Sequence, residues 1–317
     1  MSLASSLKRL ALPMAFGLAA IGTACIDLVG SDLNRYVERD EKHFTTGATP
    51  DLVLSTFDGS IEIRAWDKSE VDIAIEKRAS TKEALEQIDV EASQNGNRVT
   101  VNAKAPETHG FGIRFNFSRS AKLIVSAPAG STVSAKSGDG SITIERIAGR
   151  VDLRSGDGSI RGRELRGDVK AHTGDGSIRL DDVRGALDVD TGDGSVTVSG
   201  ALTSVRARSG DGSITIHAAA GSQASEDWNI STGDGSVVLE LPDGFSGELD
   251  AHTGDGSVRL HDLQLSNVTG EIGRHTLRGR LGSGGKLVRV RSGDGSITLR
   301  KSTMSAEREP TSPDGRR

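Results

Sequence analysis

The sequence predicts an all-β fold, a parallel β-solenoid (β-helix) with coils of about 18 residues and two strands per coil. Three observations predict it: a Gly-Asp-Gly turn recurs along the chain, apolar residues recur in the same register, and glycine is abundant while rings are scarce. The 317 residues include 40 Gly but only 7 Phe, 2 Trp and 1 Tyr. A mainly helical protein is disfavoured, because each helical Gly costs about 1 kcal/mol.

The repeated string is [Ser/Thr]-Gly-Asp-Gly-Ser-[Ile/Val]. Its first four intervals are identical in length, and the next three are all longer. Regular spacing followed by longer gaps is typical of a repeat array that carries insertions. The aspartates of the eight copies are Asp139, Asp157, Asp175, Asp193, Asp211, Asp234, Asp255 and Asp294.

Apolar residues follow the same period and alternate with polar residues within each coil. Residues 137–145 and 146–154 also align with each other, so each coil reads as two similar halves. Alternation gives each strand one inward face, and the two halves predict two facing sheets. Successive coils are then expected to stack in parallel about 4.8 Å apart. One inward column is Ile142, Ile160, Ile178, Val196 and Ile214.

The N-terminus is typical of an export signal. Lys8 and Arg9 precede an apolar run over 10–21, which is too short to span a bilayer. Residues 22–25 (Gly-Thr-Ala-Cys) resemble the bacterial lipobox, whose cysteine is lipidated. We therefore expect a signal peptide over 1–24, lipidation of Cys25 and a tether over 25–43. Ordinary cleavage after Ala24, leaving a free thiol, is the alternative.

The rest of the chain divides into three parts. Residues 44–136 carry the repeat pattern less regularly and are expected to form an irregular N-terminal β cap with a short helix near 81–87. Residues 137–301 are the regular solenoid, and residues 302–317 are predicted to be a disordered tail. The alternating segment over 111–117 is interpreted as cap core, or as a binding strip if it is exposed. Its apolar residues are Phe111, Ile113, Phe115 and Phe117.

The eight aspartates are interpreted as structural turn residues. In such turns Gly supplies a positive φ and Asp accepts turn amides. Calcium-binding β-rolls have coils of the same length, but their Asp falls where this chain has an apolar residue such as Ile142. A phosphate loop would need a following helix, and a strand pattern follows here. We therefore expect no metal ion and no cofactor.

Enzyme motifs are absent from the sequence, which has no Gly-x-Ser-x-Gly, His-Glu-x-x-His or Cys-x-x-Cys. We expect the chain not to be an enzyme. A polysaccharide-active β-helix enzyme is the catalytic alternative, with its acids in the insertions at 217–229 and 263–286. His172 and His252 share one repeat position, which predicts an outward column rather than a metal pair. The net charge of −5 disfavours a nucleic-acid partner.

Several segments resemble the putative adhesin family of bacterial envelope proteins. They are residues 60–67 (Ser-Ile-Glu-Ile-Arg-Ala-Trp-Asp), 126–130 (Ser-Ala-Pro-Ala-Gly), the repeated Gly-Asp-Gly-Ser-Ile and 282–285 (Gly-Ser-Gly-Gly). The resemblance covers about 44–301 and implies a β-solenoid in the periplasm, at the outer membrane or at the cell surface. It supplies no catalytic residues.

Two functions are compatible with this pattern. The first is a lipid-anchored scaffold that binds an envelope protein or a glycan and touches the membrane only through its anchor. The second is a structural or regulatory envelope lipoprotein without a ligand of its own.

Overall fold

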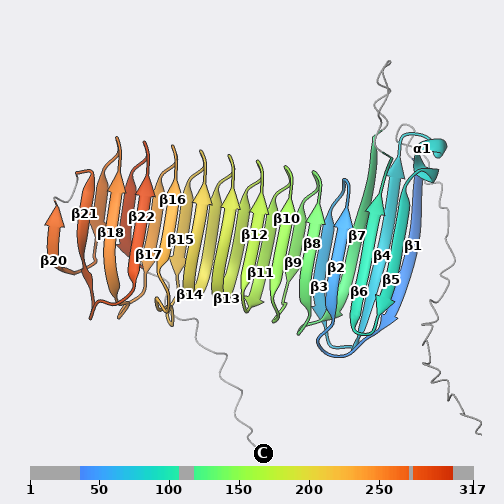
Figure 1. The fold of residues 1–317 in the computed structure, drawn as a ribbon, viewed down its shortest axis with the longest axis horizontal. Helices are drawn as coiled ribbons and strands as arrows, with labels where there is room; N and C mark the ends of the chain where they lie inside the picture. Colours follow the sequence, from blue (N-terminus) through green and yellow to red (C-terminus); the bar gives the residue numbers. More distant parts are fainter. Residues whose placement is uncertain (1–35, 107–117, 271–273, 303–317) are drawn as a thin grey trace, which may run out of the picture.

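The computed structural model describes residues 36–106, 118–270 and 274–302. These residues form one 23-stranded sheet and one short helix, which confirms the predicted all-β fold. The strands stand side by side in a long row, with α1 at one end (Figure 1). Within the described ranges, no helix has the length and apolar character needed to cross a membrane.

The elements fall into three groups along the chain. The first group is β1 (Tyr36–Thr45), β2 (Asp51–Thr56), β3 (Ile61–Trp66), β4 (Glu70–Ala79), α1 (Lys82–Glu86), β5 (Asp89–Asn95), β6 (Arg98–Lys104) and β7 (Arg119–Pro128). The second is β8 (Thr132–Ser137), β9 (Ile142–Glu145), β10 (Val151–Ser155), β11 (Ile160–Arg166), β12 (Val169–Thr173), β13 (Ile178–Thr191), β14 (Val196–Ser209) and β15 (Ile214–Ala218). The third is β16 (Trp228–Thr232), β17 (Val237–Leu241), β18 (Gly247–Thr253), β19 (Val258–His261), β20 (Leu265–Gly270), β21 (Thr276–Leu281), β22 (Leu287–Ser292) and β23 (Ile297–Lys301).

The parallel pairings fall into two ladders. The β10 ladder runs β6-β2-β8-β10-β12, then the second halves of β13 and β14, then β16-β22-β18. The β9 ladder runs β7-β3-β9-β11, then the first halves of β13 and β14, then β15-β17-β23-β19. Strands β13 and β14 each continue from one ladder into the other without a break, so the predicted boundary between two strands vanishes in those coils.

The core lies between the ladders and is built from the alternating apolar residues. The predicted inward column, from Ile142 to Ile214, is at most 1% exposed. Gly162 interrupts a second inward column, and a Cβ there would lie 2.8 Å from Leu165 and Leu180. Leu165 is fully buried and occupies this space, which explains why the column tolerates a glycine.

The N-terminal end departs from a parallel solenoid, because β4 pairs antiparallel with both β1 and β7, and β5 pairs antiparallel with β6. Residues 36–43, part of the tether predicted for 25–43, lie in β1, and β1 pairs antiparallel with β4. Residues 25–35 lie outside the described residues. From Asp40 onward every second side chain of β1 is half-buried or buried, and the series ends at Phe44, which is 8% exposed. The short helix expected near 81–87 is present as α1, and the Thr81 hydroxyl caps it by accepting a hydrogen bond from the Ala84 amide. Ala84 and Leu85 of α1 close the end of the core.

Coils at both ends of the stack are out of sequence order, which repeat spacing alone does not predict. The last coil in the sequence, β22 and β23, lies between the coil β16–β17 and the coil β18–β19. The first coil, β2 and β3, likewise lies between β6–β7 and β8–β9. The long interval between Asp255 and Asp294 therefore reflects a detour of the chain rather than an insertion within one coil.

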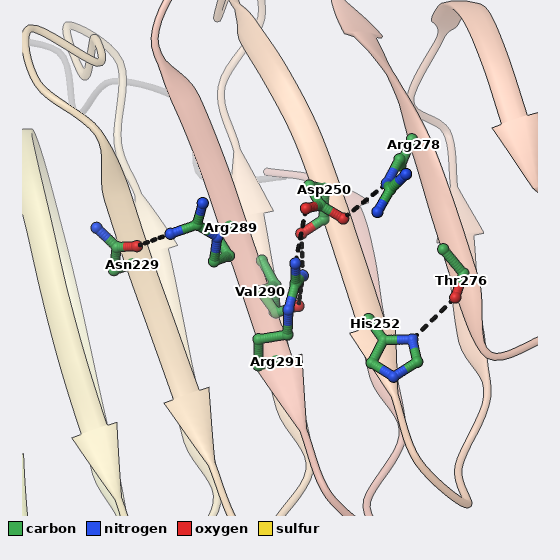
Figure 2. A network of polar contacts seen from close by, with 8 residues as sticks. All are labelled: Asn229, Asp250, His252, Thr276, Arg278, Arg289, Val290 and Arg291. Atoms are coloured by element: carbon green, nitrogen blue, oxygen red, sulfur yellow. Dashed lines mark hydrogen bonds and ion pairs between the residues drawn. The ribbon is translucent and has the colours of Figure 1, made fainter.

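Asp250 on β18 holds the last coil in place on the β10 ladder (Figure 2). Arg291 of β22 donates to its carboxylate at 2.6 Å and to its carbonyl at 2.7 Å, and Arg278 of β21 donates to the other carboxylate oxygen at 3.2 Å. Burial would raise the pKa of the Asp250 carboxyl, but the two arginines outweigh this effect and lower it.

A second carboxylate holds the same coil on the β9 ladder. Glu240 of β17 has a side chain only 6% exposed, and Arg300 of β23 donates to it at 2.6 Å. His217 Nδ1 of β15 lies 2.7 Å from the other carboxylate oxygen. Burial would raise the pKa of Glu240, and the hydrogen bonds and charges of His217 and Arg300 lower it overall. The coil β22–β23, called the intercalated coil below, is thus bound through one arginine on each ladder, Arg291 and Arg300.

Replacing Asp250 with Asn tests this clamp through pH. Because the folded pKa is lowered, the carboxylate stabilises the fold above the pH where an unfolded aspartate titrates, and the contribution is lost as pH falls through the folded pKa. We expect Asp250→Asn to reduce the free energy of unfolding by about 1–3 kcal/mol at neutral pH. The difference from the unmutated protein should shrink below about pH 4 in urea unfolding.

Asp181→Asn is the matched control. Asp181 pairs with Arg179 on the solvent side, and both side chains are well exposed. Its replacement is expected to change stability by less than about 1 kcal/mol. Equal effects of the two substitutions, or a difference for Asp250 that persists in acid, would contradict the clamp.

Candidate functional site

The Gly-Asp-Gly turns stack into a continuous ridge along one edge of the molecule. Backbone hydrogen bonds join each turn to its neighbour, for example Gly192 to the Gly174 carbonyl and Gly210 to the Gly192 carbonyl, both at 2.6 Å. The same contacts place the turn of Gly293 between those of Gly233 and Gly254. The ridge therefore follows the spatial order of the coils, including the intercalated one.

The glycines are required by close approach rather than by left-handed backbone. Neither glycine of the repeated turns has a φ in the positive range, whereas Gly59 in the degenerate copy at 58–60 does. A Cβ added to either glycine of any repeated turn would lie within 3.0 Å of a carbonyl in the neighbouring turn. The expectation that these glycines supply positive φ is wrong, and the spacing of the coils explains them instead.

The Ser or Thr before each turn is the polar residue that ties the ridge together. All eight are buried, with at most 7% exposure. The Thr173 hydroxyl donates to the Gly158 carbonyl and the Thr191 hydroxyl to the Gly176 carbonyl, each at 2.9 Å. The Ser209 hydroxyl also accepts the Gly212 amide of its own turn at 3.0 Å. These residues are Ser137, Ser155, Thr173, Thr191, Ser209, Thr232, Thr253 and Ser292.

The eight predicted aspartates form an exposed column on the ridge. Among the described residues, none donates a side-chain or backbone hydrogen bond to their carboxylates, so the expectation that Asp accepts turn amides is wrong. In several turns the amide of the second glycine instead donates its hydrogen bond to the hydroxyl of the Ser or Thr that precedes the turn. The ninth carboxylate, Asp58, has a raised pKa because of burial and then the negative charge of Asp139, despite a hydrogen bond from the Gly59 amide. The column is Asp139, Asp157, Asp175, Asp193, Asp211, Asp234, Asp255 and Asp294, each exposed to solvent.

The two histidines predicted to face outward are exposed and lie on different coils. His172 Nδ1 is 3.1 Å from an Asp190 oxygen, and His252 Nδ1 is 2.8 Å from the Thr276 hydroxyl. They are not brought together into a metal pair.

One group of potential metal ligands occurs among residues 36–106, 118–270 and 274–302, at His43, Glu70 and Asp72. His43 Nδ1 contacts Asp72, and His43 Nε2 lies 3.5 Å from Glu70. One potential ligand atom from each of these residues lies within 4.8 Å of the other two. The same contacts join β1 to β4, and exposed acidic groups commonly cluster in this way without a metal ion.

The two insertions predicted to carry catalytic acids in an enzyme, 217–229 and 263–286, are arranged differently: the first lines a groove, and the described part of the second forms strands. The segment after β15 brings Glu226 and Asp227 to the outer face of the β10 ladder, where Asp227 accepts the Leu287 amide at 3.0 Å. The described part of 263–286 forms β20 and β21, whose Arg280 donates to Glu248 at 2.8 Å. Cys25 and the segment from Phe111 to Phe117 lie outside the described residues.

Comparison with known proteins identifies the family of this fold. The family model described as Toastrack DUF4097 matches residues 50–300, which nearly coincide with the predicted range of 44–301. The chain belongs to this family. No curated protein matches this Toastrack chain.

Solved structures resemble the Toastrack chain at low identity. A putative cell adhesion protein from Clostridium sporogenes is 12% identical over 83% of this chain and 99% of its own, with a TM-score of 0.28. A putative adhesin from Bacteroides fragilis is 12% identical over 82% and 96%, with a TM-score of 0.38. A putative lipid binding protein from Parabacteroides distasonis is 14% identical over 82% and 96%, with a TM-score of 0.40. These likenesses carry no argument about what the chain binds.

The close approach of the turns is tested by adding one methyl group. Gly176→Ala would place a Cβ against the Gly158 carbonyl, so the backbone of one turn must move. We expect a loss of at least about 1–3 kcal/mol in the free energy of unfolding, measured in urea. In Gly47→Ala the new Cβ makes only an ordinary contact of 3.4 Å with Asn97, and stability should change by less than about 0.5 kcal/mol. Equal stability of both variants would contradict the packing argument.

The division of roles within the turn is tested at neighbouring residues. Thr173→Val keeps the side-chain shape but leaves the Gly158 carbonyl without its hydroxyl donor, and should cost about 1–3 kcal/mol. Asp175→Asn removes an exposed charge and should leave stability within about 0.5 kcal/mol of the unmutated protein. Thermal unfolding of both variants checks this, with the partly exposed Thr197→Val as the control. A larger loss from Asp175→Asn than from Thr173→Val would reverse the assignment.

Proposed function

We propose that this Toastrack chain is a non-enzymatic, lipid-anchored protein of the bacterial cell envelope whose outer faces bind another protein or a glycan. The anchor is Cys25, which becomes the first residue after removal of residues 1–24, and the chain touches the membrane only through it. The compartment is the periplasm, the outer membrane or the cell surface. Cofactors and nucleic acids have no part in this function.

The observation that supports binding is the regularity of the outer faces. On the β9 ladder, equivalent outward positions of five successive coils carry only threonine or arginine. Parallel pairing puts such residues about 4.8 Å apart along the stack, so the face repeats the same polar groups over a long distance. A rigid, repeated surface is the kind of feature that repeat proteins use for binding. The five residues are Thr143, Arg161, Arg179, Thr197 and Thr215.

This description depends on how each coil is divided. We infer that every regular coil contributes one strand-length segment to each ladder, including the coils where β13 and β14 continue between ladders. The inference is supported by the register, which pairs Ile178 with Val196 at one end of these strands and Thr191 with Ser209 at the other. Two flat faces then follow along the whole regular part.

Lipid anchoring is tested by Cys25→Ser in the full-length protein. The unmutated protein should fractionate with membranes and carry acyl chains on Cys25 by mass spectrometry. The variant should lose both properties, because serine cannot form the thioether. A variant that stays with the membrane fraction to the same extent would contradict the anchor.

Binding is tested by immobilising the protein that begins at Cys25 and passing isolated cell-wall glycan and solubilised envelope proteins over it separately. We expect saturable retention of one of the two. Retention of neither would contradict the binding function. A turnover product released from the glycan fraction, and lost on replacing Glu226, would instead favour a polysaccharide-active enzyme.

A further inference from the structure

The outer face of the β10 ladder contains a groove of about 220 Å³. It spans the equivalent positions of β12, β13 and β14 and is bounded by the segment that enters β16. Pockets that enclose drug-sized ligands measure roughly 300–1,000 Å³. The groove is therefore large enough for one small unit of a ligand that continues along the surface.

The hollow arises where two small residues interrupt a column of larger ones. Ala186 and Ser204 lie side by side in the register, and Asp168 and Asp227 line the groove on either side of them. The interval between Asp211 and Asp234 is the first to exceed the regular spacing, and its extra residues lead into Glu226 and Asp227. The first break in the repeat therefore supplies one wall of the groove.

Beside the row that contains Ala186 and Ser204, a second row of register partners lines the groove and carries charges of both signs. Lys170, Asp188 and Arg206 are consecutive partners in the register of β12, β13 and β14. In the described part of the chain, no ion pair or hydrogen bond engages the charged groups of these three residues or of Glu226. By contrast, Arg150 contacts Asp168 at 3.5 Å. Four charged groups with unused hydrogen-bonding capacity thus surround a floor of small side chains.

This combination selects the chemistry of a ligand. Six ionisable groups line the groove, four of them carboxylates and two of them cations, so an anionic ligand is repelled overall. The apolar lining residues Val169, Leu187 and Val205 are buried in the core, so they expose no hydrophobic surface that a lipid could contact. A hydroxyl both donates and accepts hydrogen bonds, so a ligand rich in hydroxyls satisfies the carboxylates and the cations together.

We propose that this groove binds an uncharged oligosaccharide, one sugar unit resting on Ala186 and Ser204 between the carboxylates and the two cations. The proposal rests on the binding function above and assigns that function a site and a ligand class. The stacked coils continue beyond the groove in both directions, so a chain of sugars can follow the ladder.

The experiment titrates the ¹⁵N-labelled protein with cellotetraose and chitotetraose and follows its amide resonances by NMR. We expect saturable shifts at the amides of Ala186, Ser204 and Asp227 with at least one of the two sugars. Trigalacturonate, an acidic oligosaccharide, and diglycine, a zwitterion, are titrated in parallel and should bind at least about tenfold more weakly. Equal or tighter binding of either would overturn the assignment to an uncharged sugar.

Three variants locate the site. Asp188→Asn and Arg206→Gln each remove one charged partner and should weaken sugar binding about tenfold. Ala186→Leu fills the floor and should abolish it. Arg98→Gln is the matched control, because Arg98 is also exposed but lies on β6, outside both the groove and the Thr/Arg column of the β9 ladder. Thermal unfolding of all four should match the unmutated protein, since the changed side chains do not enter the core.

The outcomes separate this proposal from the function on which it rests. Sugar binding that survives all three groove variants overturns the groove while leaving a glycan-binding face. Failure of both sugars to bind, with envelope material still retained by the immobilised protein, also overturns the groove but not the binding function. Failure of both experiments overturns the two together.

Discussion

The close approach of neighbouring turns is the constraint on which the structure depends. A carbonyl of one turn lies where a Cβ of the next would be, so both glycines around each Asp are required. The abundance of Gly and the scarcity of rings follow from the same cause, because narrow coils with Gly corners leave space for Ile, Val and Leu. Trp228 and Phe245, packed edge to face with centroids 5.1 Å apart, are buried near the intercalated coil rather than in the regular stack.

The same packing separates what holds the coils together from what they present to solvent. Buried hydroxyls and glycine amides bind across the turns, and the aspartates between the glycines are exposed. On the flat faces, inward side chains form the core and outward ones form repeated polar columns. A regular stack therefore makes long uniform surfaces, and the distinctive places on it are its irregularities, such as the groove beside Glu226 and the coil clamped by Asp250.

Repeat spacing predicts most of the fold and little of the site. The regular period from Asp139 to Asp211 determines the parallel stack, and the column beginning at Ile142 is buried as expected. Spacing does not encode spatial order, so it cannot place the coil around Asp294 between those of Asp234 and Asp255. The polar strand β1 has the sequence pattern of a tether, because only one of its side chains, Phe44, is buried.

The candidate site escapes sequence-based prediction for a physical reason as well. In the sequence the charged Asp175 stands out in its turn. The side chain that bonds the turn to its neighbour is Thr173, whose hydroxyl donates to the Gly158 carbonyl, and this contact exists only once the neighbouring coil is in place. The groove arises from two small residues on adjacent coils, Ala186 and Ser204, and single positions of this kind carry no motif. The one signal in the sequence is the first interval longer than the regular spacing, which marks the wall containing Glu226.

Native-state hydrogen exchange tests the central claim most directly. Turn amides at Gly174, Gly192 and Gly210 donate to carbonyls of neighbouring turns, although they occupy surface loops. If close-packed turns hold the stack together, these amides should exchange as slowly as buried strand amides such as that of Val189, and open together with them. Exchange at the rate of an unprotected loop, with the strands still protected, would show that the ladders alone hold the coils and would contradict the account.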